Sequence, residues 1–179
     1  MAFDASQYDQ HIPVLPEAVL AALLPDDRPV KRIIDGTLGA GGHTRLLLEA
    51  GVGHVLGLDL DPNAIAIAQS TLADYGSERV QIVQASYATM QSEVFKLGWQ
   101  HIDGILLDLG VSSMQLDEAE RGFAFMREGP LDMRFNPQGI TPTASEIVNY
   151  WDAKALSDIF YRYGEERHSR RIANAIVQE

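Results

Sequence analysis

The sequence reads Arg32-Ile33-Ile34-Asp35-Gly36-Thr37-Leu38-Gly39-Ala40-Gly41-Gly42-His43-Thr44 where its α/β character is clearest. A short apolar strand ends at an acidic residue, a glycine-rich turn follows, and residues 45–50 have a helical pattern that Gly51 ends. Strand, glycine loop and helix in this order are typical of the nucleotide-binding opening of a doubly wound α/β fold. Glycines let the backbone take positive φ angles and approach a ligand closely, and the start of the helix offers free N–H groups.

Two classes of cofactor bind loops of this kind. A dinucleotide loop follows Gly-x-Gly-x-x-Gly, and here Thr44 stands where the third glycine packs helix against strand. An S-adenosylmethionine (AdoMet) loop has an acidic residue at the end of the first strand and a looser glycine turn, which Asp35 and residues 39–42 match. A glycine-rich turn without a ligand is the third possibility. The loop favours AdoMet over NAD.

Composition narrows the class of protein. The chain has 179 residues and 46% hydrophobic content, enough for a domain with a true core. The net charge of −11 is unfavourable for general nucleic-acid binding. Residues 1–110 carry 6 basic and 14 acidic side chains and residues 111–179 carry 8 and 11, so an RNA-facing surface is expected in the later part. No membrane-spanning or signal-peptide pattern is visible, which predicts a cytoplasmic protein with no membrane partner.

The second strand, residues 54–59, ends in Asp59, 20 residues after Gly39. An acidic side chain at this place can bind both hydroxyls of a ribose. The alternative is that Asp59 caps the next helix. Asp61 suits that role better because proline follows it at the first helical position.

The third and fourth strands are expected at residues 80–84 and 102–110, in the sheet order 3-2-1-4. Tyr87 follows the third strand, where it either stacks near an adenine or packs on its own helix. Asp108 ends the fourth strand, opposite the reactive group of the cofactor. Amino-methyltransferases have an acid or amide at this place, followed by two prolines and an aromatic residue. Asp108 supplies the acid, but Leu109-Gly110 stands where the two prolines would be.

Residues 112–142 lose periodicity and predict a long ordered loop, which in a compact domain is usually functional or a boundary. Helices are expected from the capping box at Thr143–Glu146, over 152–163 with Gly164 as its stop, and over 165–177. Four basic residues gather at Arg167, His168, Arg170 and Arg171. This cluster either meets phosphates or forms a solvated helix face.

A family resemblance is carried by several segments together. They are His11-Ile12-Pro13-Val14-Leu15, Asp35 to His43, Gly104 to Ser113, Arg121-Gly122-Phe123, Gly129-Pro130-Leu131-Asp132-Met133-Arg134 and Tyr163-Gly164-Glu165-Glu166-Arg167. From about residue 8 onward the chain resembles the ribosomal RNA small subunit methyltransferase H family. The resemblance implies a Rossmann-like AdoMet-dependent methyltransferase sheet followed by a helical inserted domain. It also implies AdoMet as cofactor, small-subunit ribosomal RNA as partner, and methylation of the exocyclic N4 amine of a cytidine.

The resemblance also implies site residues. Its AdoMet contacts fall on Gly41, Gly42, His43, Asp59, Tyr87, Asp108 and Gln115. Methyl transfer to an amine needs in-line positioning and a group that orients the amine or accepts its proton, without a metal. Asp108 is the first catalytic candidate and Asp132 the second. Methylation at cytosine C5 would need a nucleophile such as a thiolate, and the sequence has no cysteine.

The domain organisation follows from these assignments. Residues 1–113 are expected to form the AdoMet-binding core and residues 114–179 the loop and helical insertion, in an incomplete methyltransferase. The sequence stops inside a helical pattern, and the apolar fourth strand is then an open edge that invites self-association. Besides the RNA methyltransferase, two alternatives stay open: a chain that binds cofactor without turnover, and an NAD-type oxidoreductase.

Overall fold

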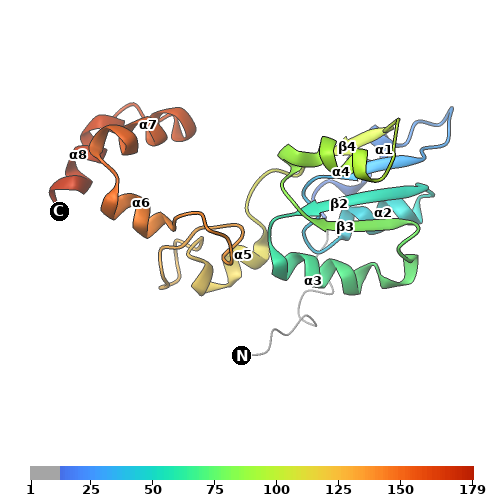
Figure 1. Ribbon diagram of the computed structural model, residues 1–179, viewed down its shortest axis with the longest axis horizontal. Helices are drawn as coiled ribbons and strands as arrows, with labels where there is room; N and C mark the ends of the chain where they lie inside the picture. The colour runs from blue at the N-terminus through green and yellow to red at the C-terminus, as the bar shows by residue number, and fades with distance from the viewer. Residues whose placement is uncertain (1–12) are drawn as a thin grey trace. The chain divides into compact units, whose positions relative to one another are not determined.

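The computed structural model describes residues 13–179, so His11 and Ile12 of the expected arm lie outside it. Its contacts divide the chain after Gly110 into two units, which are described separately (Figure 1). Within the described residues, no helix has the length and apolarity that crossing a membrane requires. The predicted domain boundary at residue 113 stays a prediction.

The first unit is built on a four-stranded parallel sheet in the order β3-β2-β1-β4. Its strands are β1 (Arg32–Asp35), β2 (His54–Asp59), β3 (Val80–Gln84) and β4 (Gly104–Leu106). Ile34 of β1 lies opposite Leu56 on one side and Ile105 on the other. The strand order and the α/β class predicted from the sequence are therefore confirmed.

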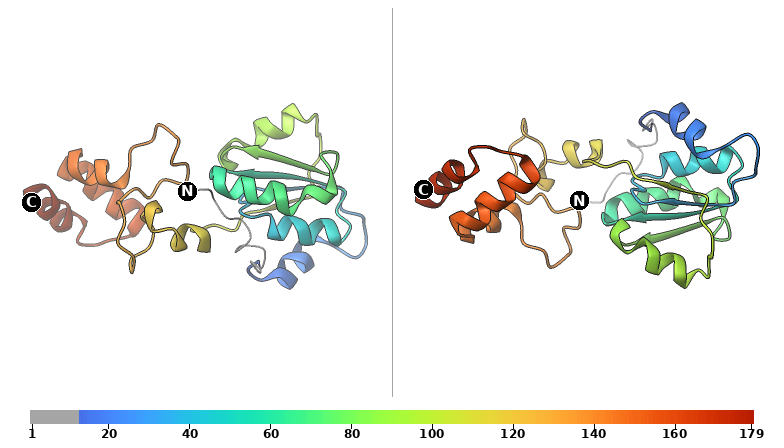
Figure 2. Two further views of the ribbon diagram at one scale, coloured as in Figure 1. Left: turned by 90° about the horizontal axis from the view of Figure 1, so that it is seen from below. Right: turned by 90° about the horizontal axis from the view of Figure 1, so that it is seen from above.

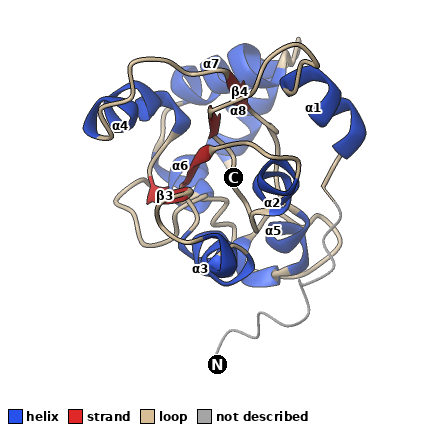
Figure 3. Cartoon of the chain, turned by 90° about the vertical axis from the view of Figure 1, so that its right-hand side faces the viewer, coloured by secondary structure: helices blue, strands red, loops and turns tan. Residues whose placement is uncertain are grey.

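Helices cover both faces of this sheet (Figure 3). One face packs against α1 (Pro16–Leu23), α2 (Gly42–Glu49) and α3 (Pro62–Thr71) through a core that includes Ile33 and Val55. The other face, with Ile34 and Leu56, packs against α4 (Met90–Lys96) and its flanking residues. Successive strand residues point to opposite faces, so a run that is apolar throughout, such as residues 55–58, is what a sheet buried on both sides requires.

Two elements of this unit differ from expectation. Strand β4 has three residues instead of the predicted nine, and they pair with Ile33, Ile34 and Asp35 of β1, which ends at Asp35. Helix α2 begins at Gly42, three residues early, because Gly41 takes a left-handed conformation and serves as its N-cap. The glycine loop and the helix therefore overlap in sequence.

The second unit is helical. It contains α5 (Ser113–Asp117), the 3₁₀ turn η4 (Ala119–Arg121), α6 (Ala144–Tyr150), α7 (Ala153–Gly164) and α8 (Ser169–Gln178). The predicted capping box at Thr143 and Glu146 is present at the start of α6. The predicted loop over 112–142 contains α5 and η4, and α8 begins four residues later than expected. That these helices form an insertion in a larger domain stays a prediction.

Helices α7 and α8 pack side by side as a hairpin (Figure 2). Leu156 and Ser157 of α7 are buried, as are Ser169 and Ala173 of α8. The Ser157 and Ser169 hydroxyls lie 3.2 Å apart in this interface. The interior of the hairpin thus combines one large apolar side chain, Leu156, with small residues.

Candidate cofactor site

The glycine loop between β1 and α2 is shaped by positive φ angles. Gly39 has φ +54° and Gly41 has φ +86°, a region that side chains other than glycine rarely adopt. An added Cβ at Gly39 would meet only the Thr37 carbonyl oxygen, at 4.0 Å. The backbone is therefore open to a ligand at Gly39. At Gly41 an added Cβ would come within 3.0 Å of Leu72, so this glycine lets α2 approach α3.

Asp59 at the end of β2 holds this loop. Its Oδ2 accepts the N–H of Gly39 at 2.8 Å and its Oδ1 accepts the N–H of Asp61 at 2.9 Å. Burial raises the pKa of Asp59, and backbone N–H donors, those of Asp61 and Gly39 foremost, oppose that rise. Asp61 caps α3 by accepting from Asn63 N, as predicted. A carboxylate has about four acceptor sites, so Asp59 retains acceptor capacity for ligand hydroxyls.

Asp35, at the end of β1, is the most deeply buried acid of the site. The Thr44 hydroxyl donates to its Oδ2 at 2.8 Å, and Thr37 N donates to its Oδ1 at 3.3 Å. Burial raises the pKa of Asp35 to about 6 despite these donors. Thr44 occupies the position of the third glycine of a dinucleotide loop. Its hydroxyl supplies a hydrogen bond to the Asp35 carboxylate, which needs one because Asp35 is only 1% exposed.

The end of β4 is fastened to the same loop. The Thr37 hydroxyl accepts the N–H of Asp108 at 2.7 Å, and Gly36 N donates to the Leu106 carbonyl oxygen at 2.9 Å. The Asp108 side chain is exposed beside this link. An added Cβ at Gly36 would meet Leu107 at 2.6 Å and Tyr87 at 3.0 Å, so these residues converge on one glycine. Tyr87 starts a 3₁₀ turn (Tyr87–Thr89) and is 42% exposed.

His43 lies in the first turn of α2, and its ring contacts the N-terminal arm. The Nε2 atom is 2.9 Å from the Val14 carbonyl oxygen. A carbonyl oxygen only accepts, so the Nε2 atom carries the proton in this contact. The ring therefore joins the arm to the glycine-loop helix.

In the first unit, acidic and basic side chains lie at opposite ends of the strands. Asp35, Asp59 and Asp108 stand at the carboxyl ends of β1, β2 and β4. The basic residues near the strands lie at the opposite ends: Arg28, Lys31 and Arg32 at the start of β1 and Arg79 just before β3. The carboxyl edge suits a ligand with positive charge and disfavours one with a pyrophosphate.

Gln115 belongs to the second unit and is 5% exposed. Its Oε1 accepts the N–H of Ser112 at 3.1 Å, and its own N–H donates to the Ser112 hydroxyl at 3.2 Å. This reciprocal arrangement is a capping box that starts α5. The side chain that the resemblance assigns to cofactor binding therefore also has a structural role.

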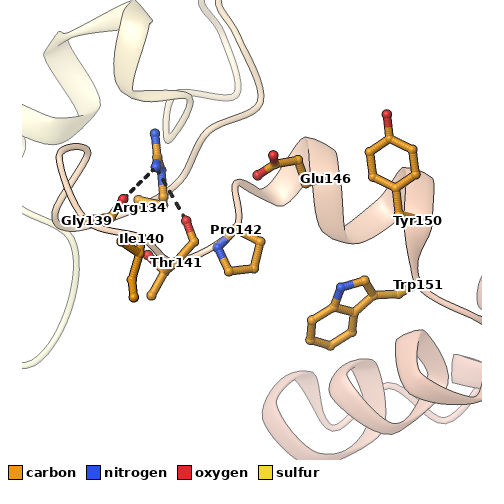
Figure 4. Close-up of a pocket in the computed structure, with 8 residues that line it drawn as sticks. All are labelled: Arg134, Gly139, Ile140, Thr141, Pro142, Glu146, Tyr150 and Trp151. Atoms are coloured by element: carbon orange, nitrogen blue, oxygen red, sulfur yellow. Dashed lines mark hydrogen bonds between the residues drawn. The ribbon is translucent and has the colours of Figure 1, made fainter.

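Asp132 forms a two-pronged ion pair with Arg134. Nε donates to Oδ1 at 2.8 Å and Nη2 donates to Oδ2 at 2.7 Å. These side-chain bonds hold the pKa of the Asp132 carboxyl below its usual range, which makes it a poor proton acceptor. Arg134 Nη1 also reaches the carbonyl oxygens of Gly139 and Thr141, as Figure 4 shows. The pair thus fastens the loop that leads into α6.

A shallow hollow lies beside this loop, within the second unit (Figure 4). Its lining residues are Arg134, Gly139, Ile140, Thr141, Pro142, Glu146, Tyr150 and Trp151. The Glu146 carboxylate is occupied by the capping bonds to Thr143. The hollow combines aromatic rings with an arginine and a glutamate that already have partners.

Two contributors to the site were missed in the sequence. Thr37 links the glycine loop to the end of β4, and Thr44 satisfies the buried Asp35. Threonine in place of the third glycine at position 44 was a usable signal, because its hydroxyl can bond to the buried acid nine residues earlier. For Thr37 the sequence offered none.

The comparisons with known proteins agree with this architecture. The model of the MraW methylase family matches residues 8–179. Relatives named ribosomal RNA small subunit methyltransferase H are 50% identical over 171 residues in Magnetococcus marinus and 48% identical over 179 residues in Roseobacter denitrificans. These matches cover 94% and 99% of this chain but 54% and 51% of the relatives, so the chain spans about half their length. The chain belongs to the MraW methylase family.

Proposed function

We propose that the protein transfers a methyl group from AdoMet to the N4 amine of a cytidine in small-subunit ribosomal RNA. The observation that carries the proposal is the carboxyl edge of the sheet, where the open backbone of Gly39 lies against the Asp59 carboxylate. The names of the relatives support a small-subunit ribosomal RNA substrate. Family membership and the acidic edge both speak against an NAD-type oxidoreductase.

The residues of the carboxyl edge fit AdoMet chemically. Asp59 would accept the ribose hydroxyls, the loop of Gly41, Gly42 and His43 would lie along the ligand, and Tyr87 would cover the base. The acidic edge complements the positive charge of the ligand. When bound, AdoMet supplies a methyl group on a positively charged sulfur.

Asp108 would orient the acceptor amine or receive its proton. It is exposed at the end of β4, and the Thr37 hydroxyl fixes its backbone. General-base help of this kind contributes about 10² to 10⁴ in rate. Asp132 would act indirectly, by shaping the loop before α6, because Arg134 occupies its carboxylate.

The direct test is methyl transfer from radiolabelled AdoMet to small ribosomal subunits that lack the modification, followed by nucleoside analysis. Label in N4-methylcytidine supports the proposal. Label in a different nucleoside contradicts the N4 assignment, and AdoMet binding without transfer favours a chain that binds cofactor only.

Asp108→Asn separates chemistry from binding. The amide keeps the shape and loses the negative charge, so turnover should fall by at least tenfold while the dissociation constant of AdoMet changes less. Single-turnover kinetics and calorimetry on the same preparation measure the two quantities. Equal losses in both would make Asp108 a cofactor contact only.

A further inference from the structure

The arginines of this chain fall into two groups. Five form ion pairs with a carboxylate (Arg28, Arg45, Arg121, Arg127 and Arg134), Arg32 lies over the Trp99 ring, and Arg79 donates to three carbonyl oxygens. The other four are Arg162, Arg167, Arg170 and Arg171, all exposed. Among residues 13–179, no ion pair or side-chain hydrogen bond engages these four. The unpaired arginines of the described chain thus lie within ten residues of one another.

Along the chain these arginines lie at the end of α7, in the turn that follows it and in the first turn of α8. The buried sides of the two helices face each other through Ser157 and Ser169, and the arginines lie outside that interface. Tyr161 and Tyr163, in the last turn of α7, are 64% and 84% exposed. We call Tyr161, Arg162, Tyr163, Arg167, Arg170 and Arg171 the arginine corner.

Helix stability does not account for the placement of Arg170 and Arg171. Arg170 and Arg171 lie in the first turn of α8, which contains no acidic residue. A cation there faces the positive end of the helix dipole, which costs about 0.3–1 kcal/mol. Arg162, in the last turn of α7, is at the end that favours a cation. The nearby Glu166 carboxylate accepts the N–H of His168 instead of pairing with an arginine.

We propose that the arginine corner binds backbone phosphates of single-stranded ribosomal RNA, with its tyrosines stacking on neighbouring bases. The inference rests on the proposed function for the identity of the RNA. In a chain of net charge −11, long-range attraction to a polyanion is lacking, so cationic contacts must be concentrated locally. Unpaired arginines beside exposed aromatic rings are the combination that single-stranded RNA requires.

The test compares two variants with the same net charge. Arg167→Gln/Arg170→Gln/Arg171→Gln removes three charges from the arginine corner. Lys31→Gln/Lys96→Gln/Lys154→Gln removes three charges at exposed lysines elsewhere, one of them on α7. The probes are a fluorescent single-stranded oligonucleotide of small-subunit ribosomal RNA and intact small subunits, each titrated from about 50 to 200 mM salt, the range over which phosphate contacts change affinity most visibly.

The arginine variant should bind both probes at least tenfold more weakly. Its plot of log affinity against log salt should be shallower by about 2, since each phosphate contact on a single strand contributes about 0.7. The lysine variant should stay within about threefold of the parent protein, a difference of about 0.7 kcal/mol. Circular dichroism melts confirm that both variants fold.

Several outcomes would overturn the proposal. They are equal losses in both variants, no loss in the arginine variant, no binding of the oligonucleotide by the parent protein, and a loss confined to intact subunits, which would indicate a protein partner. Calorimetric titration with AdoMet runs in parallel. If the parent protein fails to bind AdoMet, the proposed function fails, while the RNA titrations still decide the role of the arginine corner.

Discussion

At the scale of single residues, Asp59 joins three elements through one carboxylate, since it ends β2, accepts from the glycine loop and accepts from the start of α3. Asp59→Ala should weaken AdoMet binding at least tenfold, because hydrogen bonds to a charged acceptor are each worth about 1.5–3 kcal/mol. Titration calorimetry measures the change.

Asp103→Ala is the matched control for Asp59→Ala. The Asp103 carboxylate is equally well bonded, to the N–H groups of Lys31 and Arg32 and to Arg28, but at the amino ends of the strands. This variant should lower the melting temperature and leave the AdoMet dissociation constant unchanged. Weakened binding in both variants would mean that Asp59→Ala acts through stability alone.

Asp35 should make stability depend on pH. Because its pKa is raised from 3.8 to about 6, the folded state holds this proton more tightly than the unfolded state. The free energy of unfolding therefore falls as pH rises from about 4 to about 6, by up to ~3 kcal/mol from this group. Asp35→Asn keeps an oxygen acceptor for Thr44 and cannot ionise.

The Asp35→Asn variant should consequently gain stability relative to the parent protein as pH rises from 4.5 to 7. Urea denaturation at both values measures the difference between the two proteins, in which contributions from other carboxyls largely cancel. Parallel pH curves for the two proteins would show that Asp35 ionises normally in the folded state.

At the scale of elements, the end of α7 is strained. The sequence predicted that Gly164 stops this helix, but Gly164 is helical and Glu165 takes φ +51° instead. Glu165→Gly should raise the free energy of unfolding by about 0.5–1 kcal/mol, because glycine adopts this conformation without steric cost. Thermal melts compare it with Glu165→Ala, which keeps the Cβ and should bring no gain.

Element types were more predictable than their ends. Strands β1, β2 and β3 match the residues expected from their apolar runs. The helix caps also lie where they were predicted: Asp61 from the proline that follows it, and Thr143 from the glutamate three residues later. The end of β4 was unpredictable because pairing depends on the length of β1. The start of α2 was missed because glycine signals a turn locally, whereas the conformation of Gly41 makes it a cap.

Among the site residues, the sequence could place only those that lie at the end of a strand. The sequence placed Asp59 and Asp108 at the carboxyl edge, as the strand positions require. The assignment of Gln115 came from the family resemblance, and its capping bond to Ser112 follows a Ser-x-x-Gln signature that was overlooked in the sequence. The ion pair of Asp132 with Arg134 depends on side-chain geometry that spacing does not encode. That Gln115 touches the cofactor and that Asp132 takes part in catalysis both stay predictions.

At the scale of the whole molecule, the exposed side chains of β4 predict self-association. In the described sheet β4 pairs with β1 alone. Ile105 of β4 is 49% exposed, and Leu107, which directly follows the strand, is 40% exposed. An apolar edge strand offers unpaired N–H and C=O groups to another chain. The chain should therefore show a concentration-dependent mass in light scattering.

Ile105→Lys should shift that chain toward monomer, because a charge on an edge strand disfavours pairing. Phe95→Lys is the control, because Phe95 is 85% exposed and belongs to helix α4, not to a strand. A stable monomer of the parent chain at high concentration, or equal effects of both substitutions, would contradict association through β4.

The bond between Asp59 and Gly39 has a consequence for the thermodynamics of ligand binding. A loop rich in glycine has the most backbone freedom to lose, about 1–2 kcal/mol for each residue that becomes ordered. Here the chain's own Asp59 carboxylate fixes the loop. The free-energy cost of ordering the loop is therefore part of the free energy of folding and not of ligand binding. A ligand arriving at the loop then keeps most of its interaction energy as affinity, as expected for a preorganised receptor.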